Sequence, residues 1–564
     1  MKINKNIYPA LCAGVLGLCG AALAQTAVSI DSARIEGQLK QPTPLQNTPS
    51  GAKSKIPQAQ LKSLPGAENT VFTLKNLKII GAQHYPEDQL AVYYSALIGT
   101  EISIAKLYEV TRDMTQHYYN DGNIFSRVII PPQSIENGTI TLQVIEGFIA
   151  DITTISAPAD TFSIVKKITQ NLKSGEILNI KSLEKSLLLL NDLPGLSVKS
   201  VLEPADNRQF PAGALNLKLT FKETSQKPSL SFDNYGSRFI GPYQIGGKLS
   251  LENTFDHMAK TTVQAFQTTE FKELNYIFLS HDIPIHESGT VLGLSGNYSR
   301  VIPGFTLEAN NLKSYSKQAA IEIRQPIIRS RRKNLTTSLR LENQRSDTKV
   351  LETRLFKDRL TVVELGMNFD FHDKWKGVNL LNLKARKGLD ILGARETGSV
   401  DLSREEGRSD FTLIRGSLAR LQSISNKWSF FGLIKGQFAS APLLSSEEFG
   451  YGGNEIGFAY NASEIVGDHG LAALGELRYN AYNKNGLLLV PYAFYDIGKT
   501  WNIDRIDSTN FSGSSAGLGM RAYTDSGISL DFTLGYPLTR DVATPQWGSG
   551  SGIQAKIAVG YELQ

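Results

Sequence analysis

The pattern of apolar and polar positions divides the chain into two regions with different periods. Between residues 71 and 224, some segments repeat their apolar positions every three to four residues and others alternate strictly. These periods are typical of amphipathic helices and half-buried strands. After Pro228 the helical period largely disappears, and alternating segments follow one another to the last residues. The pattern predicts an α+β region followed by an all-β region.

The α+β region repeats one order of elements, a strand, two helices and two strands. We expect the first copy over residues 71–148 and the second over residues 149–224. Asp121-Gly122 is expected to end the second helix of the first copy. The expected elements are a strand at 72–79, helices at 86–97 and 104–120 and strands at 126–130 and 138–144, then a strand at 151–155, helices at 160–172 and 180–190 and strands at 198–202 and 215–221. Two copies in succession predict tandem α+β modules.

Residues 229–564 carry the alternation of a barrel that spans a membrane. The clearest segment sets Ile528, Leu530, Phe532, Leu534 and Tyr536 against Ser529, Asp531, Thr533 and Gly535. A β-sandwich also alternates, but segments of about ten residues that recur up to the terminus favour a transmembrane barrel, which has no open edge in lipid. At roughly 20 residues per strand and connection, the region holds about 16 antiparallel strands around a wide lumen.

The first 70 residues read as export and linker sequence. Lys2 and Lys5 precede an apolar stretch and the small-x-small site Ala22-Leu23-Ala24, which predicts a signal peptide over residues 1–24. A membrane anchor is the alternative, and the bulky Leu18 before Cys19 argues against a lipoprotein. Residues 25–40 have the apolar positions of a short amphipathic helix. Residues 41–70 are expected to be an extended tether, or simply a disordered N-terminus.

Composition excludes several classes of function. The chain has 59 Lys+Arg and 54 Asp+Glu, a net charge of +5 that gives no reason to expect a nucleic-acid partner. Its two cysteines, Cys12 and Cys19, lie in the predicted signal peptide, so a disulfide scaffold and a thiolate metal site are not expected. The seven histidines show no metal-ligand spacing, and no cofactor is expected.

One motif resembles a hydrolase nucleophile. Gly513-Ser514-Ser515-Ala516-Gly517 fits Gly-x-Ser-x-Gly, but that motif requires a strand–turn–helix elbow. The residues after it, from Leu518 to Tyr523, continue as a strand pattern. We therefore expect no enzyme activity.

Four short runs of the chain are distinctive when they are taken in order. They are Ile129-Ile130-Pro131-Pro132-Gln133-Ser134-Ile135-Glu136-Asn137-Gly138 with Val144-Ile145-Glu146-Gly147, Leu187-Leu188-Leu189-Leu190-Asn191-Asp192-Leu193-Pro194-Gly195, Asp233-Asn234-Tyr235-Gly236-Ser237 with Gly241, and Pro326-Ile327-Ile328-Arg329-Ser330-Arg331. Together these runs resemble one known family, the TpsB outer-membrane transporters of two-partner secretion within the Omp85 superfamily. The resemblance covers essentially the whole chain after residue 24.

The resemblance implies that residues 71–148 and 149–224 are POTRA domains and that residues 229–564 are the barrel. In the family such domains recognise a secreted TpsA-type partner that arrives unfolded in the periplasm, and the open edge of a three-stranded sheet suits an extended chain. The matching motif positions are Pro132, Gln133, Gly138, Glu146, Gly147, Asn191, Pro194 and Gly195. For the Gly and Pro positions, turn chemistry is the simpler interpretation.

Two further motifs concern the barrel interior. The family carries Val-Arg-Gly-Tyr/Phe at the tip of a loop folded into the lumen, and its Arg contacts the Asp of a wall motif, Phe-x-Asp-x-Gly. Here the wall motif is complete at Phe494, Asp496 and Gly498, and Gly457 and Phe458 match the loop motif, but Ile456 replaces the Arg. Either another cation pairs with Asp496, or the loop is held differently, or Asp496 is one solvated lumen residue among many.

The resemblance implies a pore in the outer membrane of a Gram-negative bacterium that exports an unfolded partner without ATP. Residues 25–40 resemble the family's plug helix, and the POTRA domains would lie in the periplasm. An Omp85-type barrel-insertion factor and a passive porin are the alternatives. We expect a monomer in outer-membrane lipid that depends on the barrel assembly machinery and periplasmic chaperones for its biogenesis. The chain ends at Gln564 rather than at the usual aromatic residue.

Overall fold

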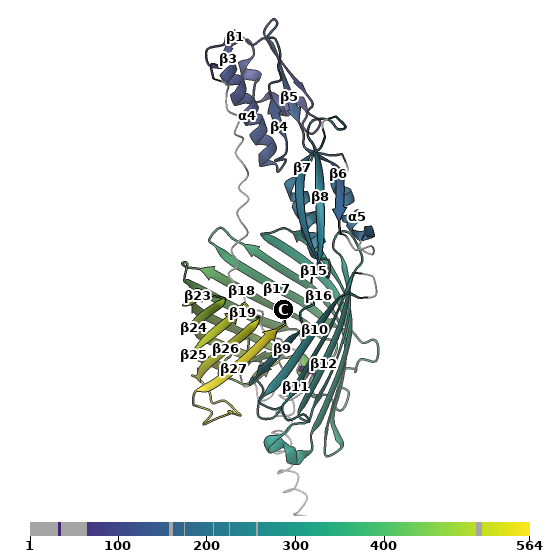
Figure 1. The fold of residues 1–564 in the computed structure, drawn as a ribbon. Helices are drawn as coiled ribbons and strands as arrows, with labels where there is room; N and C mark the ends of the chain where they lie inside the picture. Colours follow the sequence, from purple (N-terminus) through teal and green to yellow (C-terminus); the bar gives the residue numbers. More distant parts are fainter. Residues whose placement is uncertain are drawn as a thin grey trace, which may run out of the picture.

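The computed structural model describes residues 32–34, 65–156, 162–173, 175–206, 208–224, 226–254, 258–503 and 510–563. Two small modules follow one another end to end, and the second sits on the rim of a wide barrel (Figure 1). The predicted signal peptide at 1–24 and residues 41–64 of the predicted tether lie outside the described residues. So does the predicted helix at 25–40, except for Ser32–Arg34 (η1), which form one turn of 3₁₀ helix.

The first module is a three-stranded sheet in the order β2-β5-β4, packed on a long helix, with a separate two-stranded pair β1-β3. The prediction of one strand at 72–79 is wrong, because this segment forms two strands. Leu74 exchanges backbone hydrogen bonds with Gly99 and Thr100, whereas the N–H of Lys75 donates to the carbonyl of Gly138. The elements are β1 (Val71–Thr73), β2 (Asn76–Ile80), α3 (Glu87–Ala91), η2 (Ser95–Leu97), β3 (Glu101–Ser103), α4 (Ile104–Asn120), β4 (Arg127–Ile129) and β5 (Thr139–Ile145).

The second module repeats the sheet order as β6-β8-β7, with two helices packed on one face. Its elements are β6 (Phe148–Ile155), α5 (Phe162–Gln170), η4 (Asn171–Lys173), α6 (Ile180–Asn191), β7 (Leu196–Pro204) and β8 (Ala214–Glu223). Asn179 caps α6 and also donates a hydrogen bond to the carbonyl of Asp121, 2.9 Å away, which joins the two modules. Among the described residues, no helix has the length and apolar content to cross a membrane.

The barrel is closed and antiparallel, and it has 16 strands when the short β23 is counted with β22 as one interrupted strand. This confirms the predicted fold class and strand number. The strands are β9 (Ser229–Asp233), β10 (Gln244–Thr254), β11 (Ala259–Thr268), β12 (Leu274–Pro284), β13 (Val291–Val301), β14 (Lys313–Arg329), β15 (Lys333–Val350), β16 (Thr353–His372), β17 (Gly377–Gly388), β18 (Thr412–Ser423), β19 (Trp428–Ala439), β22 (His469–Tyr479), β23 (Tyr482–Lys484), β24 (Leu487–Trp501), β25 (Phe511–Thr524), β26 (Ile528–Pro537) and β27 (Gln554–Glu562).

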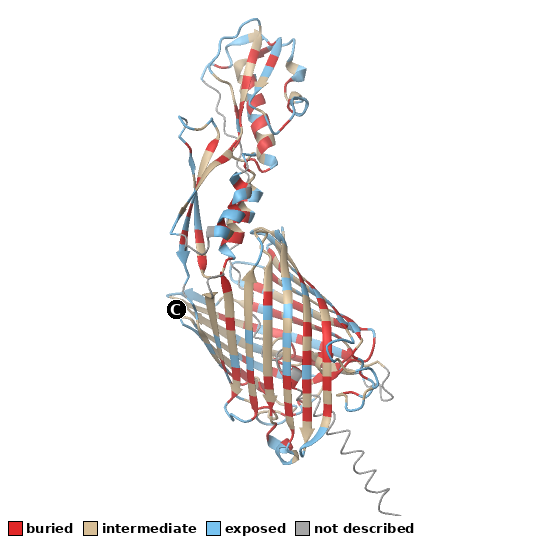
Figure 2. Cartoon of the chain, turned by 90° about the vertical axis from the view of Figure 1, so that its right-hand side faces the viewer, coloured by how far each residue is buried: buried red, intermediate tan, exposed pale blue. Residues whose placement is uncertain are grey.

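Burial in the barrel is inverted relative to a water-soluble protein. Apolar side chains on the outer face are exposed, as at Leu518 (64%) and Ile497 (47%), whereas carboxylates such as Glu364 (2%) and Glu476 (1%) are buried inside. Figure 2 shows buried, intermediate and exposed residues following one another along the barrel strands. An apolar exterior around a polar interior is the arrangement of a barrel in lipid.

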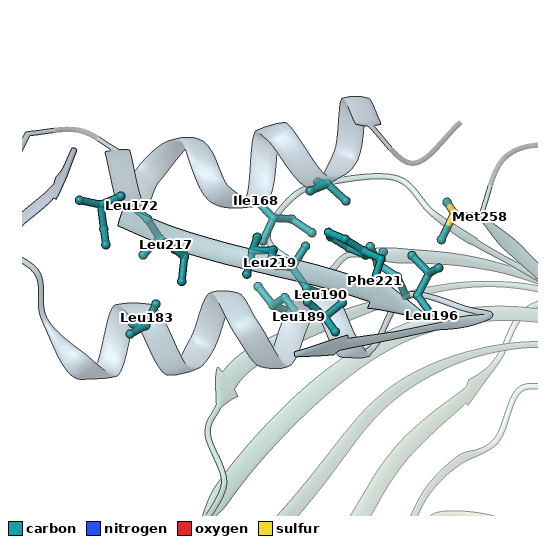
Figure 3. Packing of buried hydrophobic residues seen from close by; sticks show 14 of the residues in the cluster. Ile168, Leu172, Leu183, Leu189, Leu190, Leu196, Leu217, Leu219, Phe221 and Met258 are labelled. Atoms are coloured by element: carbon teal, nitrogen blue, oxygen red, sulfur yellow. The ribbon is translucent and has the colours of Figure 1, made fainter. Parts of the chain in front are cut away.

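The second module is seated firmly on the barrel. Met258, in the turn between β10 and β11, packs into the same apolar core as Phe221 and Leu196 of the module (Figure 3). Arg329 donates to both carboxylate oxygens of Asp192 at 2.6 and 2.7 Å. The motif run at 326–331 therefore contacts the motif run at 187–195, and the modules mark one end of the barrel.

Candidate functional site in the barrel interior

The connection between β19 and β22 folds back into the barrel and forms the core of the site. This inward loop, residues 440–468, contains a small antiparallel hairpin of β20 (Phe449–Tyr451) and β21 (Ile465–Gly467) and a 3₁₀ turn, η6 (Ser445–Glu447). Its aromatic residues form one buried cluster with side chains of β19, β22 and β24. The loop is thus packed against the wall as a protein core is packed, with most of its apolar area removed from water.

Asp496 on β24 holds this loop without the Arg that the resemblance implies. The carboxylate accepts hydrogen bonds from the Tyr451 hydroxyl at 2.6 Å, the Ser515 hydroxyl at 2.7 Å and the Phe458 backbone N–H at 3.1 Å. Asp496 is fully buried, which is tolerable because hydrogen bonds to both oxygens replace hydration. These three donors are neutral, and Lys556 of β27, which donates to the carbonyl of Tyr460 at 2.6 Å, is a cation that also acts on the carboxylate.

The wall motif occupies three successive inward-facing positions of β24. The Phe494 ring meets the Phe458 ring edge to face with centroids 4.9 Å apart. Gly498 makes room for Tyr451, since a Cβ atom there would lie 2.3 Å from the tyrosine ring. Phe494, Asp496 and Gly498 therefore act together as a receptacle for the loop residues Phe458 and Tyr451.

Ile456 and Gly457 shape the end of the loop. Ile456 is buried in the aromatic cluster rather than directed at Asp496, and Gly457 has φ +80° and lies close to the backbone of Gly452. The neighbouring Glu455 instead forms an ion pair with Lys435 of β19, with a distance of 2.6 Å. The charged residue at this end of the loop is thus Glu455, and it pairs with β19 rather than with β24.

The base of the inward loop is held by a buried charge network. Arg404, in the connection between β17 and β18, contacts Asp468 at 2.5 Å and Glu448 at 3.1 Å. Arg386 of β17 contacts Glu364 at 2.5 Å and Glu447 at 2.8 Å. Buried charges of this kind are stable only when paired, so the network fixes where the loop leaves the wall.

The described N-terminal turn lies inside the barrel beside the loop. The backbone carbonyl of Ser32 accepts a hydrogen bond from Ser299 of β13 at 2.8 Å, and its N–H donates to Ser314 of β14 at 3.2 Å. Arg34 is buried and contacts Glu448 at 3.3 Å. This turn therefore joins the inner wall to the inward loop.

Two cavities flank the loop. One, of about 510 Å³, lies toward the module end and is lined by aromatic and paired charged side chains, including Phe431, Tyr492 and Arg521. The other, of about 530 Å³, faces strands β14 to β18 and is lined mainly by charged and polar side chains. Asn454 and Glu455 line both cavities.

The motif positions of the first module form its turns and internal contacts. The Gln133 amide exchanges hydrogen bonds with the backbone of Thr141 at 2.7 and 2.8 Å, next to the exposed Pro132. Gly138 has φ +71°, and a Cβ there would lie 2.4 Å from the carbonyl of Thr73. These positions set the path of the chain into β5.

Glu146 and Gly147 connect β5 to the rest of the modules. Glu146 accepts backbone N–H groups of Gln83 and His84 and the Tyr118 hydroxyl, the last at 2.9 Å. Burial, and then this hydrogen bond, hold the pKa of the Tyr118 phenol far above its usual value. The carbonyl of Gly147 accepts the N–H of Leu178 from the second module.

In the second module, Asn191 organises the turn after α6. Its amide donates to the carbonyls of Leu187 and Val198, and its oxygen accepts the Val198 N–H at 2.9 Å. Pro194 lies in the same turn, and Gly195, with φ +76°, sits against Glu252 of the barrel. The motif positions of both modules are thus placed in turns and at junctions.

Sequence reasoning missed Tyr451, Ser515, Lys435 and Arg404 as parts of the site. Gly513 to Gly517, the run that resembles a nucleophile motif, lies inside β25 without an elbow. Ser515 instead donates a hydrogen bond to Asp496. A Cβ atom added to Gly513 would lie 2.7 Å from the Tyr451 ring, so the glycine leaves room for this side chain. The feature of the sequence that could have indicated these contacts is the group of aromatic residues in an otherwise Gly-rich loop.

Comparison with known families agrees with this geometry. A family model described as haemolysin secretion/activation protein ShlB/FhaC/HecB matches residues 214–520, more than half of the chain, and a ShlB-type POTRA domain matches residues 72–147. The chain belongs to this family. The resemblance to TpsB transporters of two-partner secretion is confirmed, and family members are outer-membrane β-barrel transporters of Gram-negative bacteria.

Individual relatives are distant in sequence but similar in length. The outer membrane transporter CdiB of Dickeya dadantii is 22% identical over 90% of this chain and 89% of its own. The heme/hemopexin transporter protein HuxB of Haemophilus influenzae is 22% identical over 76% of each chain. The solved structure of CdiB from Escherichia coli has a TM-score of 0.72 at 18% identity and covers 96% of this chain and 97% of its own, and CdiB from Acinetobacter baumannii has a TM-score of 0.65 at 19% identity and covers 100% of both chains.

Proposed function

We propose that this protein exports one unfolded partner protein through its barrel to the cell surface. The observation that carries the proposal is a closed 16-strand barrel whose polar interior is filled by a folded-back loop and whose one end carries two modules. A passive porin would have no use for the modules. A polar lumen suits an extended polypeptide, whose backbone groups need hydrogen-bond partners throughout transit.

The modules are proposed to lie in the periplasm and to capture the partner by strand addition. Within the described residues, the outer strands of both sheets are paired on one side only, β2 and β4 with β5 in the first module and β6 and β7 with β8 in the second. The open edges of the second module are eight and nine residues long. An extended chain can add to such an edge through backbone hydrogen bonds. No ATP is needed in this proposal, because folding of the exported part outside prevents its return.

The N-terminal segment is proposed to occupy the pore at rest. The described turn at Ser32–Arg34 is already inside the barrel, bound to Ser299, Ser314 and Glu448. Entry of the partner would displace it. Arg34→Gln is expected to weaken this contact and to raise the resting conductance in planar bilayers.

A barrel-insertion factor is the second candidate, and one observation favours it. Strand β9 pairs over five residues with each neighbour, β10 and β27, which is the shortest seam between full strands. The structure of BamA from Haemophilus ducreyi has a TM-score of 0.51 at 14% identity and shows a related fold. Insertion by strand exchange would require this seam to open.

The deciding experiment measures export with the seam covalently closed. Phe232 and Val559 are register partners on β9 and β27, and the chain's two cysteines lie in the predicted signal peptide, so a Phe232→Cys/Val559→Cys disulfide can be made cleanly. Export of the partner protein is expected to continue with the disulfide formed. Loss of export that a reductant restores would favour insertion instead.

Capture by the modules is tested by deletion of residues 71–148. We expect the partner to remain in the periplasm while the barrel still conducts ions. If the partner reaches the medium at the normal level, capture by the first module is wrong.

A further inference from the structure

The end of the inward loop separates the two cavities of the lumen. Residues 454–458, here called the tip, contribute Asn454 and Glu455 to the lining of both cavities, Phe458 to the module-side cavity and Ile456 to the charged one. The two cavities therefore meet at Asn454 and Glu455, between the tip and the barrel wall.

The tip is fixed to the wall by two contacts of different character. On β24 and β25, the loop makes buried hydrogen bonds to Asp496 within an aromatic cluster. On β19, Glu455 pairs with Lys435, and these side chains are 43% and 27% exposed. A buried set of shared hydrogen bonds is costly to break, whereas a half-exposed ion pair is weak and screened by salt.

Lys435 lies on β19, at the boundary between the wall that the loop covers and the charged cavity. It faces inward on β19, between Gln437 and Leu433, and lines the charged cavity together with Glu364 and Arg386. Arg386 is engaged with Glu342, Glu364 and Glu447. The ion pair to Lys435 thus holds the tip across the gap that leads into this cavity.

We propose that the Lys435–Glu455 ion pair is a positioning contact that closes the passage between the two cavities and opens it when the pair breaks. The hydrogen bonds to Asp496 keep Phe458 and the rest of the loop on the wall while Asn454 and Glu455 move. The closing contact of this chain thus lies on β19, separate from the hydrogen bonds to Asp496 on β24. This proposal rests on the proposed function in one respect only, namely that the molecule passing between the cavities is the exported partner.

Ion conductance tests the contact without any exported partner. In planar bilayers, Glu455→Gln and Lys435→Met are each expected to raise the ratio of open to closed time about two- to five-fold, the range for a partly exposed pair. The exchanged pair Lys435→Glu/Glu455→Lys is expected to restore the ratio of the parent protein. Glu352→Gln, which removes the exposed ion pair with Lys313 at the far end of the barrel, should leave the ratio unchanged.

The dependence of the open fraction on ionic strength is a second test. A purely structural role of the two side chains would not produce such a dependence. Raising KCl from 0.1 to 1 M shortens the screening length from about 10 to about 3 Å. The open fraction of the parent protein should rise toward that of Glu455→Gln, while the variant shows no such rise. Equal open fractions in the parent and both single variants, or failure of the exchanged pair to restore closure in a folded barrel, would overturn the proposal.

A cross-linking arm separates this proposal from the proposed function. Lys435→Cys/Glu455→Cys joined by a short cleavable bifunctional reagent should show no openings until a reductant is added. If openings follow the reductant but no partner is ever exported, the contact stands and the export function fails. If openings persist in the cross-linked protein, the contact does not close the passage.

Discussion

The two walls of the barrel interior are built in different ways. The packed wall, strands β22 and β24 to β26, carries glycines and aromatic residues and is covered by the inward loop, with Asp496 fully buried at its centre. The charged wall, strands β14 to β18, presents Glu322, Arg340, Glu342 and Arg386 to a cavity. One wall behaves as a protein core that retains a loop, and the other as a polar surface along which a chain can pass.

The packed wall should be the more sensitive to a single deletion. Asp496→Ala leaves the Tyr451 hydroxyl, the Ser515 hydroxyl and the Phe458 N–H without their shared acceptor, which should lower the free energy of unfolding by at least about 3 kcal/mol. Urea titration of the barrel in detergent micelles measures this. Asp206→Ala, at an exposed carboxylate of the second module, is the control. A cost equal to that of the control would show that Asp496 does not hold the loop.

A smaller effect is expected from filling the space on the packed wall. Gly498→Ala places a methyl group 2.3 Å from the Tyr451 ring, and overpacking of this kind costs about 1–3 kcal/mol. Gly436→Ala on β19 meets its nearest atom at 3.5 Å and should cost under about 0.5 kcal/mol. The same urea titration compares them, and equal losses would mean that the loop is not tightly packed against β24.

The smallest change in stability is expected on the charged wall. Lys384 is 38% exposed and pairs with Glu364, which Arg386 also contacts, so Lys384→Gln should cost less than about 1 kcal/mol. The lumen becomes more negative, and the reversal potential in a KCl gradient should shift toward cation selectivity. Lys222→Gln on β8, outside the barrel, should shift nothing. A loss of stability as large as that of Gly498→Ala would remove the distinction between the walls.

The fold could be predicted from the sequence because it depends on local periods. Residues 528–536 alternate since one side faces lipid and the other the lumen, and Phe532, Leu534 and Tyr536 are exposed as expected. The helix at Ile104–Asn120 was predicted to the residue because its end is signalled by Asp121-Gly122. The break at Leu74 was not predicted, because it depends on partners more than 20 residues away.

The site was only partly predictable. The resemblance identified Asp496 and Phe458, but the donor Tyr451 lies 45 residues from Asp496, in a loop without any period. Glu455 and Lys435 are 20 residues apart, one in a loop and one on a strand, and no pattern along the chain indicates that they meet. Contacts between a folded-back loop and a wall depend on tertiary packing, which the apolar–polar period of the sequence does not report.

Cross-linking from adjacent residues of one strand tests the passage most directly. Arg340 on β15 lines the charged cavity, and its neighbour Leu339 is exposed on the outer face. A photoreactive amino acid at either position, in cells where a fused folded domain stalls the partner in transit, reports which face the partner touches. The account predicts cross-links from position 340 and none from position 339. Cross-links from position 339, or none from position 340 while the partner is stalled, would contradict it.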